Sequence, residues 1–300
     1  MMAFIKNKWN MPPMALWVVT AAVFLCAVVW VGGCSPLTAF NTLAPADSGG
    51  SAAKTDLAYG RHSRQKLDVY VPSKQSAAAP VVVVIYGGSW NSGNKNDYAF
   101  LGKALSSRGF VAVIADYRLV PEIRFPAFLE DTAEAVAWAR TNARQFGGDP
   151  DRLYLLGHSA GAYNAVMVAL DGQYLRAFGA DPSQIRGVIG LAGPYDFLPL
   201  DAQSTIAAFG QASDLSKTQP INFVSRNAPA MLLATGDADT TVYPRNTVSL
   251  AGKLKAAGAS VTVRHYPGVG HIGIMLALSL PLRGTAPVLD DITKFINGER

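Results

Sequence analysis

The stretch Leu153–Ala165, LYLLGHSAGAYNA, decides the fold. Its first half is an apolar run typical of a buried strand, and its second half has small residues with a helical pattern. Ser159 stands between the two halves, with Gly157 and Gly161 two positions away on either side. This spacing predicts a tight strand-to-helix turn, approached so closely by neighbouring backbone that glycine is needed. Ser159 is therefore a candidate nucleophile, with the free N–H groups of a helix N-terminus behind it.

Strand-like and helix-like segments alternate on both sides of this turn. The run VVVVIY at 81–86 predicts a strand buried on both faces, and the alternating KLDVYV at 66–71 predicts an edge or half-exposed strand. Further strands are expected at 110–117, 152–157, 187–193, 230–236 and 260–266, and helices at 125–146, 160–170, 244–257 and 289–296. In the helix at 244–257, Val248, Ala251 and Leu254 are expected on one apolar face. The alternation predicts an α/β fold with a mostly parallel central sheet and helices on both faces.

A serine hydroxyl is a poor nucleophile without a base, and the base should lie at the carboxyl ends of the strands. His271 fits this requirement, because its glycine-rich loop YPGVGHIG directly follows the last predicted strand. His158, inside the turn, is expected to point away from the site. Asp237 and Asp239 follow the strand at 230–236, and either carboxylate could orient the imidazole. The chain order serine, aspartate, histidine is that of an α/β-hydrolase.

An oxyanion formed at Ser159 needs hydrogen-bond donors. Gly87, Gly88 and Ser89 follow the central strand at 81–86, and their N–H groups could act together with that of Ala160. Alone, the segment would be interpreted as an ordinary glycine-rich turn. The serine and the loop histidine favour the oxyanion interpretation.

The N-terminus has the layout of a targeting signal. Lys6 and Lys8 precede an apolar stretch from Met14 to Val31, so residues 1–33 are predicted to be a signal peptide or membrane anchor. Val31-Gly32-Gly33-Cys34 resembles a bacterial lipobox, which implies lipidation of Cys34; an uncleaved anchor and simple secretion remain alternatives. Residues 34–58 are predicted to be a flexible tether, and residues 59–300 the folded domain. All three alternatives place that domain outside the cytoplasm, and a lipid or helix anchor would hold it in the bacterial cell envelope.

Composition narrows the functional classes. Only 16% of residues are charged and the formal net charge is +5, which argues against nucleic-acid binding. The two cysteines, Cys26 and Cys34, both precede the predicted folded domain. That domain is therefore expected to have no disulfide, no cysteine zinc site and no cysteine nucleophile. We expect no metal or other cofactor.

Five motifs carry a family resemblance: YGGSW (86–90), DYRLVP (116–121), GGDPDRLYLLGHSAG (147–161), GDADTTV (236–242) and GVGH (268–271). Over roughly residues 59–298 the chain resembles the α/β-hydrolase superfamily. Within it, the HGG-motif branch of carboxylesterases, hormone-sensitive-lipase-like and kynurenine-formamidase-like enzymes is the most similar. The resemblance implies Ser159 as nucleophile, Asp239 rather than Asp237 as acid, and His271 as base. One departure is Tyr86, which replaces the histidine that usually precedes the two glycines.

The sequence thus predicts a serine hydrolase that cleaves carboxylic esters, with short-chain or polymer-borne acyl groups, through an acyl-enzyme. Formamidases, amidases and peptidases use the same three residues and remain alternatives, as do a lipid-remodelling enzyme and a non-catalytic envelope binding protein. Residues 194–229 could form a small cap over the site. Asp116 and Arg118 are expected to form a buried structural pair, and Trp90 to line the pocket or to pack.

Overall fold

The computed structural model describes residues 36–74 and 78–299. The chain divides into two units, Met1–Ala44 and Pro45–Arg300; the first contains the helix α2 (Pro36–Leu43). The predicted signal or anchor at 1–33 and the lipidation site Cys34 lie outside the described residues. Among the helices formed by 36–74 and 78–299, none has the length and apolar character to cross a membrane.

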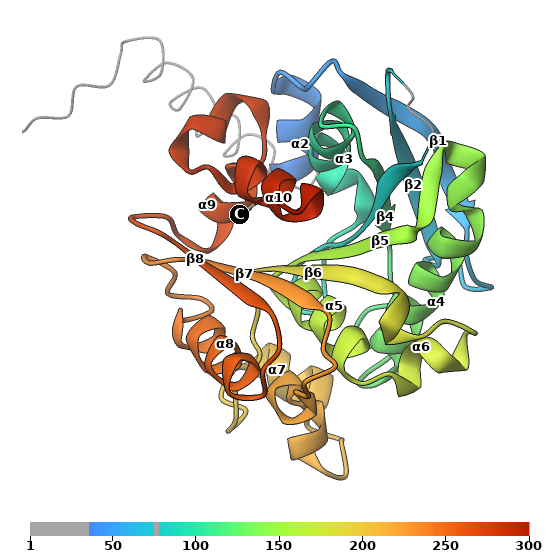
Figure 1. The fold of residues 1–300 in the computed structure, drawn as a ribbon. Helices are drawn as coiled ribbons and strands as arrows, with labels where there is room; N and C mark the ends of the chain where they lie inside the picture. The colour runs from blue at the N-terminus through green and yellow to red at the C-terminus, as the bar shows by residue number, and fades with distance from the viewer. Residues whose placement is uncertain (1–35, 75–77, 300) are drawn as a thin grey trace, which may run out of the picture. The chain divides into compact units, whose positions relative to one another are not determined.

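The second unit is built on one eight-stranded sheet, with strand order β1-β2-β4-β3-β5-β6-β7-β8 (Figure 1). The strands are β1 (Gly50–Ala58), β2 (Lys66–Pro72), β3 (Ala79–Ile85), β4 (Val111–Ala115), β5 (Gly148–His158), β6 (Ile185–Leu191), β7 (Ala230–Gly236) and β8 (Val261–Tyr266). The six strands from β3 to β8 are parallel, whereas β1 and β2 are antiparallel to their neighbours. The predicted α/β-hydrolase fold class is confirmed.

Helices cover both faces of the sheet. They are α3 (Ala99–Ser107), α4 (Ala127–Asn142), α5 (Ala160–Leu170), α6 (Gln173–Ala177), α7 (Gln203–Phe209), α8 (Arg245–Ala256), α9 (His271–Leu276) and α10 (Val288–Asn297). In Figure 1, α3 and α10 lie on one side and α5 and α8 on the other. The pair Arg108–Asp290, at 2.8 Å, joins the end of α3 to α10. In α8, Val248 is 53% exposed and Leu250 is buried with Ala251 and Leu254, so the predicted apolar face was wrong at Val248.

The order in which the chain adds strands to the sheet determines where the candidate site lies. From β3 the chain winds outward to β4 on one side, and from β5 it winds through β6 and β7 to β8 on the other. β3 and β5 are neighbours, with Ile85 level with Gly157. The loops that leave their carboxyl ends therefore meet at the topological switch point, where open α/β sheets bind ligands. Val81–Val84 in β3 are at most 1% exposed, as the β-branched run predicts.

The predicted tether at 34–58 is wrong over residues 50–58, which form the edge strand β1. β1 pairs antiparallel with β2, and Lys95 lies within 2.8 Å of both Asp56 in β1 and Asp68 in β2. The side chains of Lys95 and Asp68 are at most 4% exposed, so the Lys95 ammonium group neutralises a buried carboxylate. The compact unit begins at Pro45, and β2 is a covered strand rather than the predicted edge.

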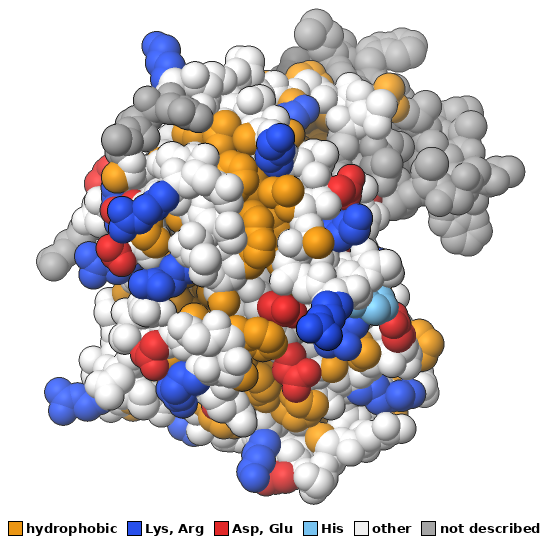
Figure 2. Space-filling model, turned by 90° about the vertical axis from the view of Figure 1, so that its right-hand side faces the viewer, with side chains coloured by type: hydrophobic (Ala, Val, Ile, Leu, Met, Phe, Trp, Pro, Cys, Tyr) orange, Lys and Arg blue, Asp and Glu red, His pale blue; other side chains and the backbone are white. Residues whose placement is uncertain are grey.

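Charged side chains of both signs are scattered over the face that looks toward the right-hand side of Figure 1. Figure 2 shows this face, with Lys and Arg interspersed with Asp and Glu around a band of apolar side chains. A surface patterned in this way presents no extended field of one sign to a partner.

Candidate active site

Ser159 occupies the strained turn that its sequence predicts. It follows β5 directly and precedes α5, with φ of 54° and ψ of −124°, a left-handed conformation that residues other than glycine rarely adopt. Its backbone N–H donates to Leu191 O at 2.9 Å, which ties the turn to β6. A Cβ at Gly161 would lie 2.0 Å from Ile85 O, and one at Gly157 would lie 2.2 Å from Gly161 O. Both glycines are therefore required by close backbone contact.

The structure brings together the three residues predicted to act in catalysis. His271 begins α9, and its Nε2 lies 2.8 Å from Ser159 Oγ. On the other side of the ring, Nδ1 lies 2.7 Å from Asp239 Oδ2. Because a carboxylate can only accept, Nδ1–H donates to Asp239, and the bare Nε2 accepts from the Ser159 hydroxyl. This arrangement allows His271 to withdraw the serine proton.

The geometry also separates the two candidate aspartates. Asp239 is 2% exposed, and its Oδ1 accepts from the N–H groups of Thr241 and Val242 at 2.9 Å each. Its second oxygen is thereby aimed at His271. Asp237 instead lies 2.9 Å from His265 in a partly exposed pair. Asp239, which the family resemblance favoured, is the carboxylate in contact with the candidate base.

Three of the four predicted oxyanion donors are free. Within the described residues, the backbone N–H groups of Gly88, Ser89 and Ala160 donate to no protein acceptor. Ser89 has a φ of 51°, so it also adopts a left-handed backbone conformation. The prediction that Gly87 is a free donor was wrong, because its N–H donates to Tyr98 Oη at 3.2 Å. Its role is close contact instead: a Cβ on Gly87 would lie 2.9 Å from Ser159 Cβ.

Tyr86, the departure from the HGG pattern, is fully buried beneath this loop. Its hydroxyl donates to Asp116 Oδ1 at 2.8 Å and accepts from Arg64 Nη2 at 2.8 Å. Its ring stacks between Tyr98 and Tyr117, at centroid distances of 5.6 and 4.9 Å. Burial raises the pKa of Tyr86 well above its ordinary value, so it stays a neutral phenol.

Asp116 and Arg118 do not pair with each other, which corrects the expected brace. Arg118 instead makes a forked contact with Asp131, at 2.7 Å for the shortest pair of atoms. Asp116 accepts from Tyr86 and from the backbone N–H of Lys95. The side chain of Asp131 is only 1% exposed, so this buried carboxylate takes the guanidinium group that was expected to pair with Asp116. Both residues are structural, as expected, but through distant partners.

Trp90 packs rather than lining an open pocket. It is 2% exposed, and its indole N–H donates to Asn164 Oδ1 at 3.0 Å. Its ring lies 5.3 Å from Tyr163 and 4.8 Å from Phe209 by centroid distance. Phe209 ends α7, inside the predicted cap at 194–229, so this segment packs on the loop after β3. The segment also contains short 3₁₀ turns at Leu215–Thr218 and Pro220–Phe223.

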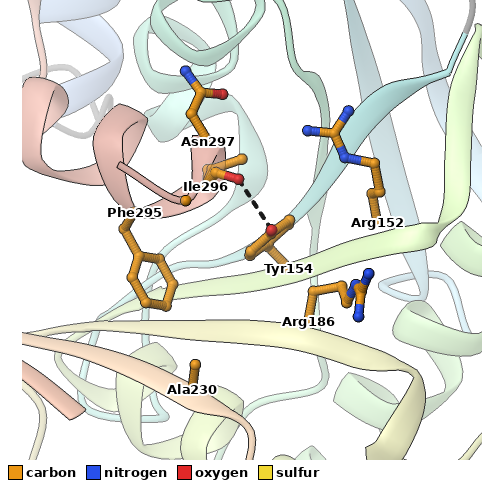
Figure 3. Close-up of a pocket in the computed structure, with 8 residues that line it drawn as sticks. Arg152, Tyr154, Arg186, Ala230, Phe295, Ile296 and Asn297 are labelled. Carbon is orange, nitrogen blue, oxygen red and sulfur yellow. Dashed lines mark hydrogen bonds between the residues drawn. The ribbon is translucent and has the colours of Figure 1, made fainter. Parts of the chain in front are cut away.

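A concave site of about 410 Å³ lies at the opposite end of the sheet (Figure 3). It is lined at the amino ends of β5, β6 and β7 by Arg152, Tyr154, Arg186 and Ala230, and by the end of α10. It contains none of the predicted site residues. Across residues 36–74 and 78–299, no group of three or more His, Cys, Asp or Glu is placed to hold a metal ion.

Comparison with known proteins identifies the family of this chain. The profile of the BD-FAE family matches residues 67–254, from β2 to the end of α8. The chain belongs to the BD-FAE family. The residues matched by this α/β-hydrolase family include the Ser159 turn, the loop after β3 and the loop that holds Asp239, whereas the His271 loop lies beyond them.

Curated relatives of this BD-FAE chain are esterases and methylesterases. A probable isoprenylcysteine alpha-carbonyl methylesterase of Arabidopsis thaliana is 28% identical over 271 residues, which cover 83% of this chain and 64% of the relative. Esterase LipC of Mycobacterium tuberculosis is 31% identical over 264 residues, which cover 80% of this chain and 63% of the relative. The chain thus spans a little under two thirds of the length of these relatives.

Solved structures share the fold. A carbohydrate esterase from gut microbiota superposes with a TM-score of 0.73 at 25% identity, over 85% of this chain and 98% of that one. Esterase B from Lactobacillus rhamnosis, inhibited by a tributyrin phosphonate, superposes with a TM-score of 0.77 at 18% identity, over 93% and 95% of the two chains.

Sequence reasoning missed the residues that support the site from a distance. Arg64 and Tyr98 hold the loop after β3, and His158 contacts the His271 loop rather than pointing away. No local pattern marks Arg64 or Tyr98. His158 carried one usable signal, its place beside Ser159 at the end of a buried strand.

Proposed function

We propose that this chain is a serine hydrolase that cleaves carboxylic esters. The observation that carries the proposal is the continuous chain of contacts Ser159–His271–Asp239, at 2.8 and 2.7 Å, on a strained strand-to-helix turn. Free N–H groups converge beside it, and this combination is what acyl transfer requires. The names of the esterase relatives support an ester rather than another acyl compound.

In the proposed reaction, Ser159 Oγ attacks the acyl carbonyl while its proton passes to His271 Nε2. Asp239 stabilises the imidazolium and holds it in the correct orientation. The tetrahedral oxyanion accepts hydrogen bonds from the N–H groups of Gly88, Ser89 and Ala160, aided by the N-terminal end of α5. His271 then protonates the departing alcohol, and water releases the acyl group by the same route in reverse.

The acyl group is proposed to be short. The aromatic cluster of Trp90, Phe128, Tyr163, Phe197 and Phe209 fills the space between the loop after β3, α4, α5 and the segment before α7. All but Phe197 are at most 2% exposed. A site whose neighbouring space is already packed with side chains accepts a small acyl group more readily than a long chain. The alcohol can be small or part of a polymer, and a carbohydrate esterase among the structural neighbours supports the second.

The test is hydrolysis of p-nitrophenyl acyl esters, from acetate to palmitate, by the full chain. Ser159→Ala and His271→Ala are assayed beside it, together with labelling by a fluorophosphonate. Turnover of short chains that vanishes in both variants supports the proposal, and the labelled residue should be Ser159. Folded protein that turns over formanilide or peptide substrates but no ester would replace the proposal by the amidase alternative.

For location, we propose that residues 1–33 direct the domain across a membrane and that Cys34 is lipidated, with the domain in the cell envelope. The support is the sequence alone: the lysines, the apolar stretch and the lipobox-like Val31–Cys34. Metabolic labelling with radioactive palmitate tests this directly. Label that persists in Cys34→Ser would contradict lipidation at this position.

A further inference from the structure

His158 is a buried side chain beside the nucleophile that the proposed reaction does not use. It ends β5, is 3% exposed, and its ring lies 5.0 Å from the ring of His271 by centroid distance. His158 Nε2 lies 3.0 Å from the backbone oxygen of His271. A carbonyl oxygen can only accept a hydrogen bond, so Nε2 carries the proton and donates it to the main chain of His271.

The other edge of the ring contacts the loop after β3. His158 Nδ1 is buried and has no hydrogen-bond partner among the residues that the structure describes. A Cβ added at Gly87 would lie 3.0 Å from this nitrogen and 2.9 Å from His158 O. A buried N–H without an acceptor is costly, so Nδ1 is the bare nitrogen of a neutral ring.

Burial keeps His158 in this neutral form. It lowers the pKa of His158 to about 4, and the neighbouring His271 ring acts in the same direction, while the hydrogen bond to the His271 backbone and the charge of Asp239 oppose the change. His271 and Asp239 are the titratable side chains that act on His158. The ring can therefore stand beside the imidazolium formed at His271 without adding a second positive charge.

Resting on the proposed function, we infer that His158 is a positioning residue that fixes the backbone of His271 and seats the loop after β3. One imidazole thereby sets the base and the oxyanion donors relative to Ser159. The need is local, because Gly268, Gly270 and Gly273 surround His271 and leave its backbone permissive. A base displaced by about 1 Å can cost about 100-fold in rate.

The test compares two replacements of His158 in the full chain. His158→Gln keeps an N–H donor near the position of Nε2, whereas His158→Phe keeps a ring of similar size without a donor. We expect kcat for p-nitrophenyl acetate to fall about 10- to 100-fold in His158→Phe, with KM within about threefold. His158→Gln should recover most of the lost kcat, because it restores the bond to His271 O. His265→Phe, in the exposed pair with Asp237, is the matched control and should retain wild-type kcat.

Thermal unfolding separates positioning from loss of structure, because a merely structural role would lower the unfolding temperature without the donor-dependent change in kcat. Wild-type kcat in His158→Phe, or equal losses in the Phe and Gln variants, would overturn the inference. An independent readout is the ¹⁵N NMR of the wild-type ring, which should show Nε2 protonated and Nδ1 bare between pH 6 and 8. The opposite tautomer or a charged ring would also overturn it. Absence of ester turnover in the wild type would contradict the proposed function alone, since the NMR result does not depend on activity.

Discussion

Removal of the Tyr86 hydroxyl tests how the loop after β3 is held. In Tyr86→Phe the ring remains stacked between Tyr98 and Tyr117, so the change is confined to one oxygen. That oxygen donates to Asp116 and accepts from Arg64. The backbone oxygen of Tyr86 keeps its hydrogen bond from Tyr117 Oη at 3.1 Å. The variant therefore isolates the contribution of the side-chain hydrogen bonds.

The magnitude follows from what the partners retain. Asp116 keeps the N–H of Lys95 and an Arg64 contact at 3.7 Å, and Arg64 keeps the backbone oxygens of Tyr117 and Gly93. Both groups thus lose one hydrogen bond of several. A hydrogen bond to a charged, largely buried group contributes about 1.5–3 kcal/mol, so we expect a loss of about 2 kcal/mol. For a unit of this size that lowers the unfolding temperature by about 4–8 °C.

The pH dependence has a definite sign. Burial raises the pKa of Asp116 above its ordinary 3.8, and the hydrogen bond from Tyr86 opposes that rise. A raised pKa means that the folded state holds the proton more tightly, so stability falls as pH rises from 3.8 through the folded value. Tyr86→Phe raises the folded pKa further. Its destabilisation should therefore be largest above that window and smaller below pH 3.8, where Asp116 is protonated in both states.

Urea unfolding of wild type and variant at pH 3.5, 5 and 8 measures this difference. Esterase assays of the wild type and of the Tyr86→Phe variant should show kcat reduced by only a few fold in the variant, with KM unchanged. Tyr98→Phe is a useful comparison, because its hydroxyl contacts the N–H of Gly87 rather than a carboxylate, and its effect should not vary across this pH range. A destabilisation below about 0.5 kcal/mol, the usual range for a surface substitution, would refute the reasoning. So would an effect of equal size at all three pH values.

Three further predictions concern the site itself. Asp239→Asn should lower kcat about 10³- to 10⁴-fold with little change in KM, because the amide favours the wrong His271 tautomer; steady-state kinetics measures this, and a loss below tenfold would contradict it. Trp90→Ala should destabilise the fold by about 3–5 kcal/mol and raise kcat/KM for hexanoate relative to acetate, and an unchanged chain-length profile would argue against the packed-acyl-site reasoning. Gly87→Ala should reduce fluorophosphonate labelling of Ser159 at least about tenfold, because the new Cβ meets His158 O and Ser159 Cβ at 2.9 Å; labelling at the wild-type rate would show that the loop can shift.

The sequence was informative where chemistry depends on local backbone. The Ser159 turn, the free N–H groups of Gly88 and Ser89, and the buried strand β3 all follow from residue types within a few positions. His271 could be placed because parallel strands bring their carboxyl ends to one edge, whatever the chain length between them. Asp237 and Asp239 are too close in sequence for such reasoning, and only the family resemblance favoured Asp239. The structure separates them by the contact of Asp239 with His271 and by the N–H groups of Thr241 and Val242 that orient its carboxylate.

The predicted tether failed for a different reason. The tether at 50–58 was inferred from small, polar composition, but these residues form β1 through backbone bonds to β2 and through the contact of Asp56 with Lys95. Lys95 is far from both strands in the sequence, and a lysine in a polar loop gives no sign that it will be buried. Removing its charge would leave Asp68 buried without its cation, which typically costs about 3–5 kcal/mol. The edge strand is thus specified by a charge 39 positions away from Asp56, and no window of sequence that contains only one of the two partners could have predicted it.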